Sequence, residues 1–349
     1  PLYSSAASDV YKRQGLSSPN VKNVYQDRFG YIWIMTEDGL NRYDGSVIKI
    51  YRNDPDNPKS LYNNSVYSAV EDTAGFLWIG GSGVVSRYDY ATESFNTKVL
   101  NSASPSEKER MVISLFTDSK GRIWAGTSGS SVHKLNPVLK SFEAMYYDED
   151  ENMMSGASMV WSITELKNGK ILLADFIRGI YQYDETSGKF FKFFLSDNFS
   201  PDNIFKIQED DDGLIWFSGT NKVIRYNPNF YSYEILDEFN LQKPLYHLGF
   251  HKVSEDNYII VSEPFGLIRY NPKTSSIIET IKTPLTPYWF TPDKFGIIWI
   301  AAYGGLIKYD PNRKPFTHVQ FNAAENQNER SSILKYLSCL LYTSDAADE

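Results

Sequence analysis

Alternating apolar segments, separated by turns rich in aspartate and glycine, recur along the chain. The clearest copy spans residues 30–44: a glycine opens a strand that carries Trp33, a second turn follows around Gly39, and another strand ends at Tyr43 and Asp44. Apolar positions that repeat every second residue between such turns are typical of β-strands in hairpins. The segment therefore predicts two antiparallel strands.

This pattern returns seven times. Aligned on Trp33, the copies have anchors 40 to 48 residues apart, which are Trp33, Trp78, Trp124, Leu172, Trp216, Ile259 and Trp299. Each copy predicts four strands: a first strand such as 66–71, the anchor strand, a third strand ending near Tyr-Asp or Tyr-Asn, and a short aromatic fourth strand. The expected fourth strands include 47–51, 190–194, 230–235 and 316–319.

Four-stranded units of about 40 to 45 residues are typical of β-propellers. We therefore expect an all-β fold, a seven-bladed β-propeller of four-stranded antiparallel blades. The tryptophans Trp33, Trp78, Trp124, Trp216 and Trp299 are interpreted as structural repeat residues between blades, because an indole fills the wedge between twisted sheets while its N–H needs one partner. The turn aspartates are expected to accept backbone N–H bonds, and the turn glycines to adopt positive φ.

Several strings resemble the two-component regulator propeller family. Its first repeat is matched by residues 15–21, 24–27, 30–34 and 36–45, and its second by 60–61, 66–67, 71–72 and 77–80. The resemblance covers 15–338 and is weakest where Leu172 and Ile259 replace tryptophan. It implies the periplasmic sensor region of a Bacteroidetes-type hybrid two-component histidine kinase, part of an inner-membrane receptor.

The resemblance also implies partners and a signal. The same chain would continue into a second propeller, an immunoglobulin-like domain, a membrane helix and phosphorelay domains, and a homodimer is one expected state. The ligand would be an oligosaccharide released by glycan breakdown. The kinase activity belongs to the absent parent region, so this fragment is not expected to be an enzyme.

The two ends of the chain look foreign. Residues 1–14 and 339–349 resemble translated adapter sequence from library preparation and are expected to be non-native tails. The propeller is then expected over 15–331 and the start of a further repeat over 332–338. The single cysteine, Cys339, falls in the second tail, so the rest offers no disulfide or thiolate chemistry.

Charge and hydropathy exclude two further classes. The net charge of −8 becomes −6 without the tails, and no long Lys/Arg run is present, which argues against nucleic-acid contact by this segment. The longest nearly apolar run, 297–307, is shorter than the about 20 residues that span a bilayer.

Catalytic and cofactor motifs are absent from the sequence. No nucleophile elbow, phosphate-binding loop or dinucleotide fingerprint occurs in a supporting context, and no cofactor is expected. The four histidines, His133, His247, His251 and His318, do not form a metal pattern on strands, so no metal site is expected. Asp175 and Glu263 lie off the repeat pattern and leave a glycoside hydrolase or lyase as an alternative, which needs two carboxylates about 5 to 9.5 Å apart.

A binding site is expected where the copies disagree on one rim of the disc. The turns between second and third strands share a face with the connections between blades, and they supply the candidate ligand-binding residues Asp175, Phe176, Arg178, Glu263, Phe265 and Tyr303, with Glu37, Asp38 and Asn221 nearby in the pattern. Aromatic platforms beside polar groups suit sugar rings. Trp161 and Trp289, in first strands beside the channel, are interpreted as blade packing. A third alternative is a structural propeller whose ligand site lies in an absent domain.

Overall fold

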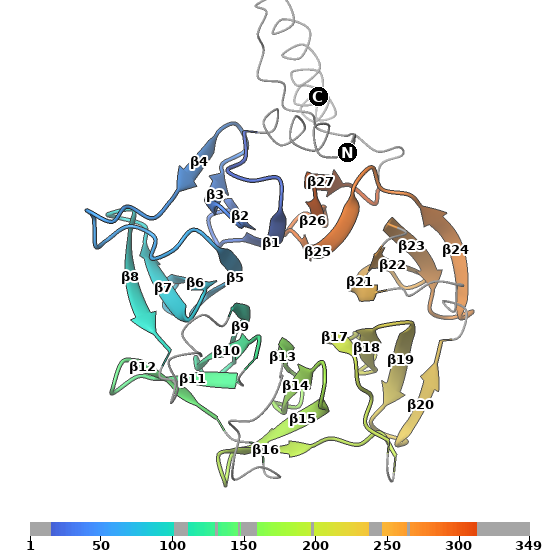
Figure 1. Ribbon diagram of the computed structural model, residues 1–349. Helices are drawn as coiled ribbons and strands as arrows, with labels where there is room; N and C mark the ends of the chain where they lie inside the picture. The colour runs from blue at the N-terminus through green and yellow to red at the C-terminus, as the bar shows by residue number, and fades with distance from the viewer. Residues whose placement is uncertain are drawn as a thin grey trace, which may run out of the picture.

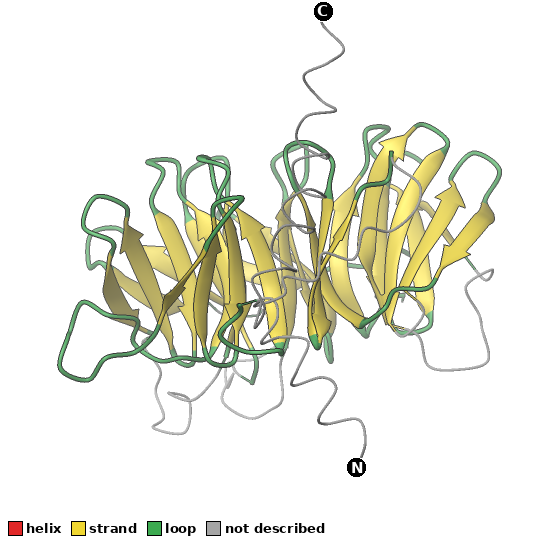
Figure 2. Cartoon of the chain, turned by 90° about the horizontal axis from the view of Figure 1, so that it is seen from above, coloured by secondary structure: helices red, strands yellow, loops and turns green. Residues whose placement is uncertain are grey.

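Seven antiparallel sheets surround a central axis (Figure 1). The structure is a computed structural model that describes residues 15–100, 111–129, 132–145, 147, 159–196, 199–236, 246–263 and 266–312. Figure 2 shows the disc edge-on, with the strands running between its two faces. The predicted seven-bladed all-β propeller is confirmed.

In blades 1 to 4 the strands follow the chain from the axis outward. Blade 1 contains β1 (Val21–Gln26), β2 (Ile32–Thr36), β3 (Gly39–Tyr43) and β4 (Ile48–Tyr51). Blade 2 contains β5 (Val66–Glu71), β6 (Leu77–Gly81), β7 (Val84–Asp89) and β8 (Ser94–Val99). Blade 3 contains β9 (Val112–Thr117), β10 (Ile123–Thr127), β11 (Val132–Asn136) and β12 (Ser141–Ala144). Blade 4 contains β13 (Val160–Glu165), β14 (Ile171–Asp175), β15 (Gly179–Asp184) and β16 (Lys189–Lys192).

The remaining blades keep this order. Blade 5 contains β17 (Ile204–Glu209), β18 (Ile215–Gly219), β19 (Lys222–Asn227) and β20 (Ser232–Ile235). Blade 6 contains β21 (Tyr246–Ser254), β22 (Asn257–Glu263), β23 (Gly266–Asn271) and β24 (Ser276–Ile281). In the described part, blade 7 contains β25 (Thr286–Pro292), β26 (Ile298–Tyr303) and β27 (Gly305–Tyr309). Its expected fourth strand at 316–319 and the further repeat at 332–338 lie outside the described residues.

An aspartate clamp holds the turn between the first two strands of each blade that carries the repeat tryptophan. In blade 1, Asp27 Oδ1 accepts the backbone N–H groups of Phe29 (3.0 Å) and Tyr31 (2.9 Å), while Oδ2 accepts Trp33 Nε1 (2.7 Å). Gly30 completes the turn with φ of +91°, a conformation that glycine adopts without a steric penalty. The same Asp–Trp bond recurs in four other blades, as Asp72–Trp78 (2.7 Å), Asp118–Trp124 (2.8 Å), Asp210–Trp216 (2.7 Å) and Asp293–Trp299 (2.9 Å).

Blades 4 and 6 lack both partners of this bond. The residue six positions before Leu172 is Leu166, and the two are buried in one apolar cluster. The residue six positions before Ile259 is Val253, and these two also share a cluster. A buried carboxylate without its N–H donor is costly, so the carboxylate and the indole are replaced together by aliphatic side chains.

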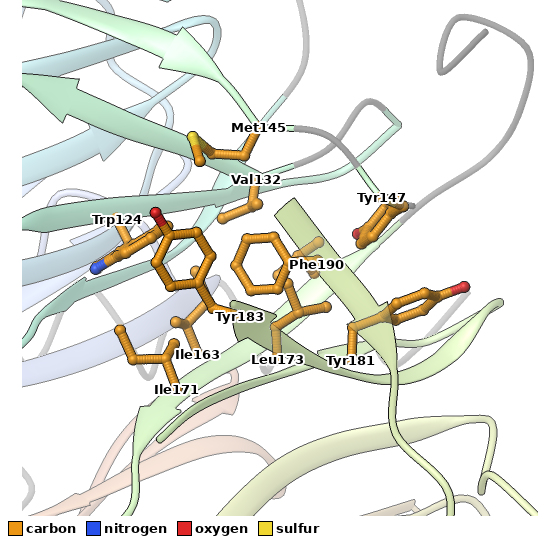
Figure 3. Packing of buried hydrophobic residues seen from close by; sticks show 11 residues of the cluster. Trp124, Val132, Met145, Tyr147, Ile163, Ile171, Leu173, Tyr181, Tyr183 and Phe190 are labelled. Carbon is orange, nitrogen blue, oxygen red and sulfur yellow. The ribbon is translucent and has the colours of Figure 1, made fainter. Parts of the chain in front are cut away.

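The hydrophobic core lies between neighbouring blades. Figure 3 shows the interface of blades 3 and 4, where Trp124 and Val132 meet Leu173, Tyr183 and Phe190. The rings of Trp124 and Tyr183 lie edge to face with centroids 4.9 Å apart. All five repeat tryptophans are at most 8% exposed and lie in the apolar clusters between blades.

Blades 1 and 7 close the ring by packing side by side. Val21 and Ile34 of blade 1 share a buried cluster with Trp299 of blade 7. Across the same interface Thr291 Oγ1 donates to the Val24 carbonyl (2.5 Å). β1 pairs within its own blade, so closure uses the same packing as the other blade interfaces.

A side-chain latch repeats on the face opposite the starts of the inner strands. The last residue of an inner strand accepts a backbone N–H from the turn of the preceding blade. The bonds are Glu71 to Arg28 N (2.8 Å), Glu165 to Ser119 N (2.6 Å), Glu209 to Lys167 N (2.6 Å) and, at ring closure, Gln26 to Lys294 N (2.8 Å). In the part of the chain that the structure describes, no helix is long and apolar enough to cross a membrane.

The aspartate clamp makes a prediction for stability. Asp27→Ala leaves an indole N–H and two backbone N–H groups without their acceptor and should lower the free energy of unfolding by about 3 kcal/mol, measured by urea denaturation. The exposed Asp56, changed to Ala, is the matched control and should shift it by less than about 0.5 kcal/mol.

The aliphatic pairs of blades 4 and 6 supply a sharper version of this experiment. Asp27→Leu with Trp33→Leu imitates Leu166 and Leu172, so the double variant should be more stable than the sum of the two single changes predicts. Strict additivity would contradict the clamp as a coupled pair.

Candidate ligand-binding mouth

Every innermost strand carries a β-bulge at the same place near its start. The register of each inner strand against its neighbour skips one residue, and the seven bulge residues are Lys22, Tyr67, Ile113, Trp161, Phe205, Leu248 and Tyr288. A bulge leaves one residue unpaired, bends the strand and redirects a side chain. We call the end of the channel where these inner strands begin the mouth.

Aromatic side chains form one side of the mouth. The ring of Phe205 lies 5.7 Å from Trp161, 4.9 Å from Phe176 and 5.8 Å from Tyr246, measured between centroids. These residues come from blades 4, 5 and 6. The result is a continuous apolar platform at the starts of β13, β17 and β21.

Two tryptophans meet across the channel near the mouth. Trp161 of β13 and Trp289 of β25 reach toward each other from blades 4 and 7, on opposite sides of the ring (Figure 1), and stack with centroids 6.3 Å apart and planes at 26°. The space left beside them is a cavity of about 10 Å³, room for about one water molecule. Its lining residues are Lys22, Asn23, Tyr67, Ile113, Trp161, Tyr288 and Trp289.

The opposite side of the mouth is polar. Lys22 Nζ pairs with Glu37 (2.7 Å), which also accepts a hydrogen bond from Asn20 (2.8 Å). The Lys22 ammonium lies 5.3 Å from the ring centroid of Tyr288 and 5.9 Å from that of Tyr303. Although burial acts to raise it, the hydrogen bonds from Lys22 and Asn20 hold the pKa of Glu37 below its ordinary value.

Glu263 stands between these two sides. It lies opposite Tyr246 in the β21–β22 register, and burial raises the pKa of its carboxyl. Burial also raises the pKa of Tyr288 to about 12, with smaller contributions in the same direction from Tyr303, Glu263 and Glu37, which places these groups near one another. Among the described residues, no cation or hydrogen-bond donor lies within bonding distance of the Glu263 carboxylate.

The structure corrects the prediction for Asp175. Its side chain is 0% exposed and caps the β14–β15 turn: Oδ1 accepts the N–H groups of Ile177 and Arg178 (both 3.1 Å), and Oδ2 accepts the Tyr147 hydroxyl (3.2 Å). Asp175 is therefore not a ligand residue on the rim surface. The hydrolase hypothesis loses one of its two carboxylates with it.

The other predicted residues divide between the mouth and its surroundings. Phe176, Glu263 and Tyr303 lie at the mouth, where the Tyr303 ring is 45% exposed and packs on Tyr288 at 5.3 Å. Arg178 instead lies over the Tyr147 ring at 5.6 Å. Phe265 lies outside the described residues.

Three secondary candidates have separate positions. Glu37 reaches the mouth, whereas Asp38 pairs with Arg52 (2.9 Å). Asn221 adopts φ of +55° in the β18–β19 turn, which gives it a local conformational role.

Sequence reasoning did not identify Lys22, Tyr67, Phe205, Tyr246 and Tyr288 as candidate site residues. It interpreted Trp161 and Trp289 as blade packing, whereas they also stack on each other across the channel. One signal in the sequence could have identified these residues. In each first strand, one position changes from copy to copy and stands between positions that repeat.

The histidines described by the structure show no metal-binding arrangement. No group of three or more His, Cys, Asp or Glu side chains suited to a metal occurs in the described ranges. His247 is 0% exposed, and burial lowers its pKa to about 4, while burial also lowers the pKa of His251. His318 lies outside the described residues.

A larger groove of about 400 Å³ lies on the opposite face between blades 5 and 6. Its lining includes Tyr233, Glu255, Tyr258 and Lys273. Arg225 also lines it and already donates to the Pro272 carbonyl (2.8 Å) and pairs with Glu234. The arginine of this groove is thus engaged within the protein, and the mouth remains the better candidate.

The comparisons with known proteins agree with the repeat pattern. The family model described as "Two component regulator propeller" matches residues 15–38, 63–83 and 106–129. The resemblance stated from the sequence is thereby confirmed over these three stretches.

One curated relative and two solved structures are also similar to the chain. "Histidine kinase P4" of Formosa agariphila is 47% identical over 47 residues, 14% of this chain and 3% of that protein. The extracellular domain of a protein described as the hybrid two component system BT3049 of B. thetaiotaomicron superposes with a TM-score of 0.65 at 19% identity, over 83% of this chain and 40% of that one. The corresponding domain of BT4673 gives 0.67 at 19% identity, over 84% and 41%.

These likenesses show the propeller fold. The chain spans less than half the length of the two solved structures and a small part of the kinase. The fold alone does not define a ligand, which has to be argued from the mouth.

Burial of His247 makes a prediction for acid stability. In the folded protein its pKa is about 4, below the ordinary 6.5 of an exposed histidine, so between these values the unfolded chain binds a proton that the folded chain does not. Stability should therefore fall as pH drops through this window, by up to about 3 kcal/mol from this residue.

Urea unfolding of the wild type and of His247→Gln from pH 7 to pH 4 measures this contribution. The wild type should lose stability relative to the variant as pH falls. A difference between the two that stays constant with pH would contradict the assignment.

Proposed function

We propose that this propeller is the ligand-sensing domain of a periplasmic receptor, part of a hybrid two-component histidine kinase anchored in the inner membrane. Its ligand is an oligosaccharide derived from glycan breakdown. The proposal is supported by the two-component regulator propeller repeats and by the fold shared with extracellular domains of two-component systems. The observation that carries it is the mouth, where an aromatic platform faces a half-buried carboxylate.

The chemistry of the mouth suits a sugar. A pyranose has an apolar face that stacks on aromatic rings and an edge of hydroxyl groups that exchange hydrogen bonds. Trp161 and Phe205 supply such rings. Within the described residues no protein donor bonds to the Glu263 carboxylate, which can therefore accept from a sugar hydroxyl. The hydroxyls of Tyr288 and Tyr303 add groups that both donate and accept.

Signalling requires that the ligand bind two receptor states with different affinity. Residues on the mouth come from separate blades, with Glu263 on blade 6, Tyr303 on blade 7 and Lys22 on blade 1. A ligand that bridges them would favour one arrangement of these blades. The second propeller, the downstream signalling domains and a partner receptor in a homodimer would transmit that preference to the kinase.

A glycoside hydrolase or lyase is the second candidate. Burial raises the pKa of Glu263, and after its hydrogen bonds the pKa of Glu37 lies below its ordinary value. Two carboxyl groups shifted in opposite directions are the combination that a general acid and its ionised partner require. Lys22 and Asn20 already occupy Glu37, which favours binding over catalysis.

Calorimetric titration of the purified chain with a panel of oligosaccharides tests the proposed function. At least one should bind, and Tyr303→Ala should weaken that binding by about ten-fold or more because it removes an exposed ring of the mouth. Asp56→Ala changes an exposed side chain that does not line the cavity at the mouth, so it is the control and should leave the affinity unchanged.

Two results would redirect the proposal. If no oligosaccharide binds, the propeller is a structural module and the ligand site lies in another domain of the parent. If chromatography shows the oligosaccharide being cleaved, and Glu263→Gln stops the cleavage, the mouth is an active site.

A further inference from the structure

We infer that the bulge residues of the inner strands, more than the turns of the rim, determine which ligand binds at the mouth. The ligand group that these residues bind is an uncharged sugar ring. This inference rests on the proposed function and deepens it. It assigns specificity to positions inside the channel mouth, where the side chains come from rigid strands.

The positions around the bulge repeat because the architecture requires them. The residue before it is aliphatic in the first five blades, namely Val21, Val66, Val112, Val160 and Ile204. The residue after it in blades 1 to 3 donates to a carbonyl of the next inner strand: Asn23 to Tyr67 O (3.2 Å), Ser68 to Val112 O (2.7 Å) and Ser114 to Val160 O (2.6 Å). These flanking residues hold the blades together.

The bulge residue itself has no such constraint. Across the seven blades it is lysine, tyrosine, isoleucine, tryptophan, phenylalanine, leucine and tyrosine in turn. Its side chain leaves the ladder of the strand, and in five blades it lines the small cavity below the mouth. Phe205 adds a sixth contact through Trp161. Variation at one redirected position, inside a motif otherwise fixed by packing, is the pattern expected of residues selected by a ligand.

Leu248 provides an internal contrast. It occupies the bulge position of blade 6 but is only 4% exposed, and it packs in the apolar cluster between blades 6 and 7. Tyr246, two residues earlier, contacts Phe205 at the mouth in its place. Leu248 should therefore contribute to stability and not to ligand choice.

The geometry around Trp161 decides how a ligand can lie. The cavity beside the Trp161–Trp289 stack has about 10 Å³, far less than a sugar ring requires, so the ligand is placed at the mouth, above this cavity. The rings of Trp161 and Phe205 meet at 72°, so a pyranose stacks its apolar face on one of them and contacts the edge of the other. The hydroxyl edge then faces Tyr67 and Tyr288.

The charges at the mouth favour a neutral ligand. Lys22 is the charged member of the bulge set, and Glu37 neutralises it at 2.7 Å. Glu263 leaves a carboxylate that accepts hydroxyl groups and repels a uronate or a sulfate. Lys206 is a second lysine nearby, with Nζ 5.3 Å from the Trp289 ring centroid, and burial lowers its pKa, which favours its uncharged form.

The experiment compares matched variants on one panel of probes. The probes are linear hexaoses of glucose, xylose and mannose, with oligogalacturonate and sulfated galactan oligosaccharides as acidic counterparts, titrated calorimetrically into the purified chain. A neutral hexaose should bind at least about ten-fold tighter than any acidic probe. Trp161→Ala and Tyr67→Ala should each weaken that binding by about ten-fold.

Three controls separate a role in recognition from a role in folding. Leu248→Ala should lower the unfolding midpoint while the folded protein keeps its affinity. Tyr233→Ala removes an exposed aromatic ring on the outer strand β20 and should change nothing. Trp161→Phe preserves an aromatic floor, so this variant should keep the fold and change the order of preference among the neutral hexaoses even if Trp161→Ala is unstable.

The outcomes distinguish the two levels of the argument. Binding of a neutral hexaose that survives all bulge variants within about two-fold would overturn this inference and leave the proposed function standing. Tighter binding of an acidic probe would overturn the assignment of an uncharged ligand. Binding of no probe at all would overturn the proposed function and the inference with it.

Discussion

The hydrogen bond between a turn aspartate and the indole six residues later fixes five of the seven blades. One carboxylate oxygen organises the turn between the first two strands, and the other orients the tryptophan that fills the space between blades. Local turn chemistry and long-range packing are thereby set by a single side chain. Blades 4 and 6 show the same constraint from the opposite case. Where Leu172 or Ile259 replaces the tryptophan, Leu166 or Val253 replaces the aspartate as well.

Because of this arrangement, the residue types on the two faces of the disc are constrained to different degrees. On one face the aspartate turns join the first two strands of their blades, and the latches from Glu71, Glu165 and Glu209 tie blades 2, 4 and 5 to the blade before each. At the other end of the inner strands the bulges release one side chain per blade from the ladder. Structural residues thus concentrate at one face, and residues free to vary gather at the mouth.

The fold could be predicted well because the repeat carries its own signals. Aspartate, glycine and tryptophan recur at fixed spacing, and this spacing is enough to place the turns, the strands and the core between blades. In the sequence, the aspartate of Asp27 and the tryptophan of Trp33 appeared as two separate repeating features and not as a hydrogen-bonded pair. The coupled loss of both residues in blades 4 and 6 would have revealed it.

The candidate site was predicted less completely, for physical reasons. Asp175 departs from the repeat and so drew attention, yet it caps its own turn and is fully buried. Glu263 and Tyr303, also predicted from the sequence, lie at the mouth, and their role in binding stays a prediction. The contributions of Tyr67, Phe205 and Tyr288 depend on a shift of one residue in strand register, which alternation of apolar residues does not show.

The central claim is that a ligand binds against the aromatic side chains of Trp161 and Phe205 at the mouth. A crystal structure of the chain with the tightest-binding neutral oligosaccharide at saturating concentration tests it most directly. The account predicts a sugar ring stacked on Trp161 or Phe205 and in contact with the other, with a hydroxyl group hydrogen-bonded to Glu263. Ligand density in the groove between blades 5 and 6, with an empty mouth, would contradict it.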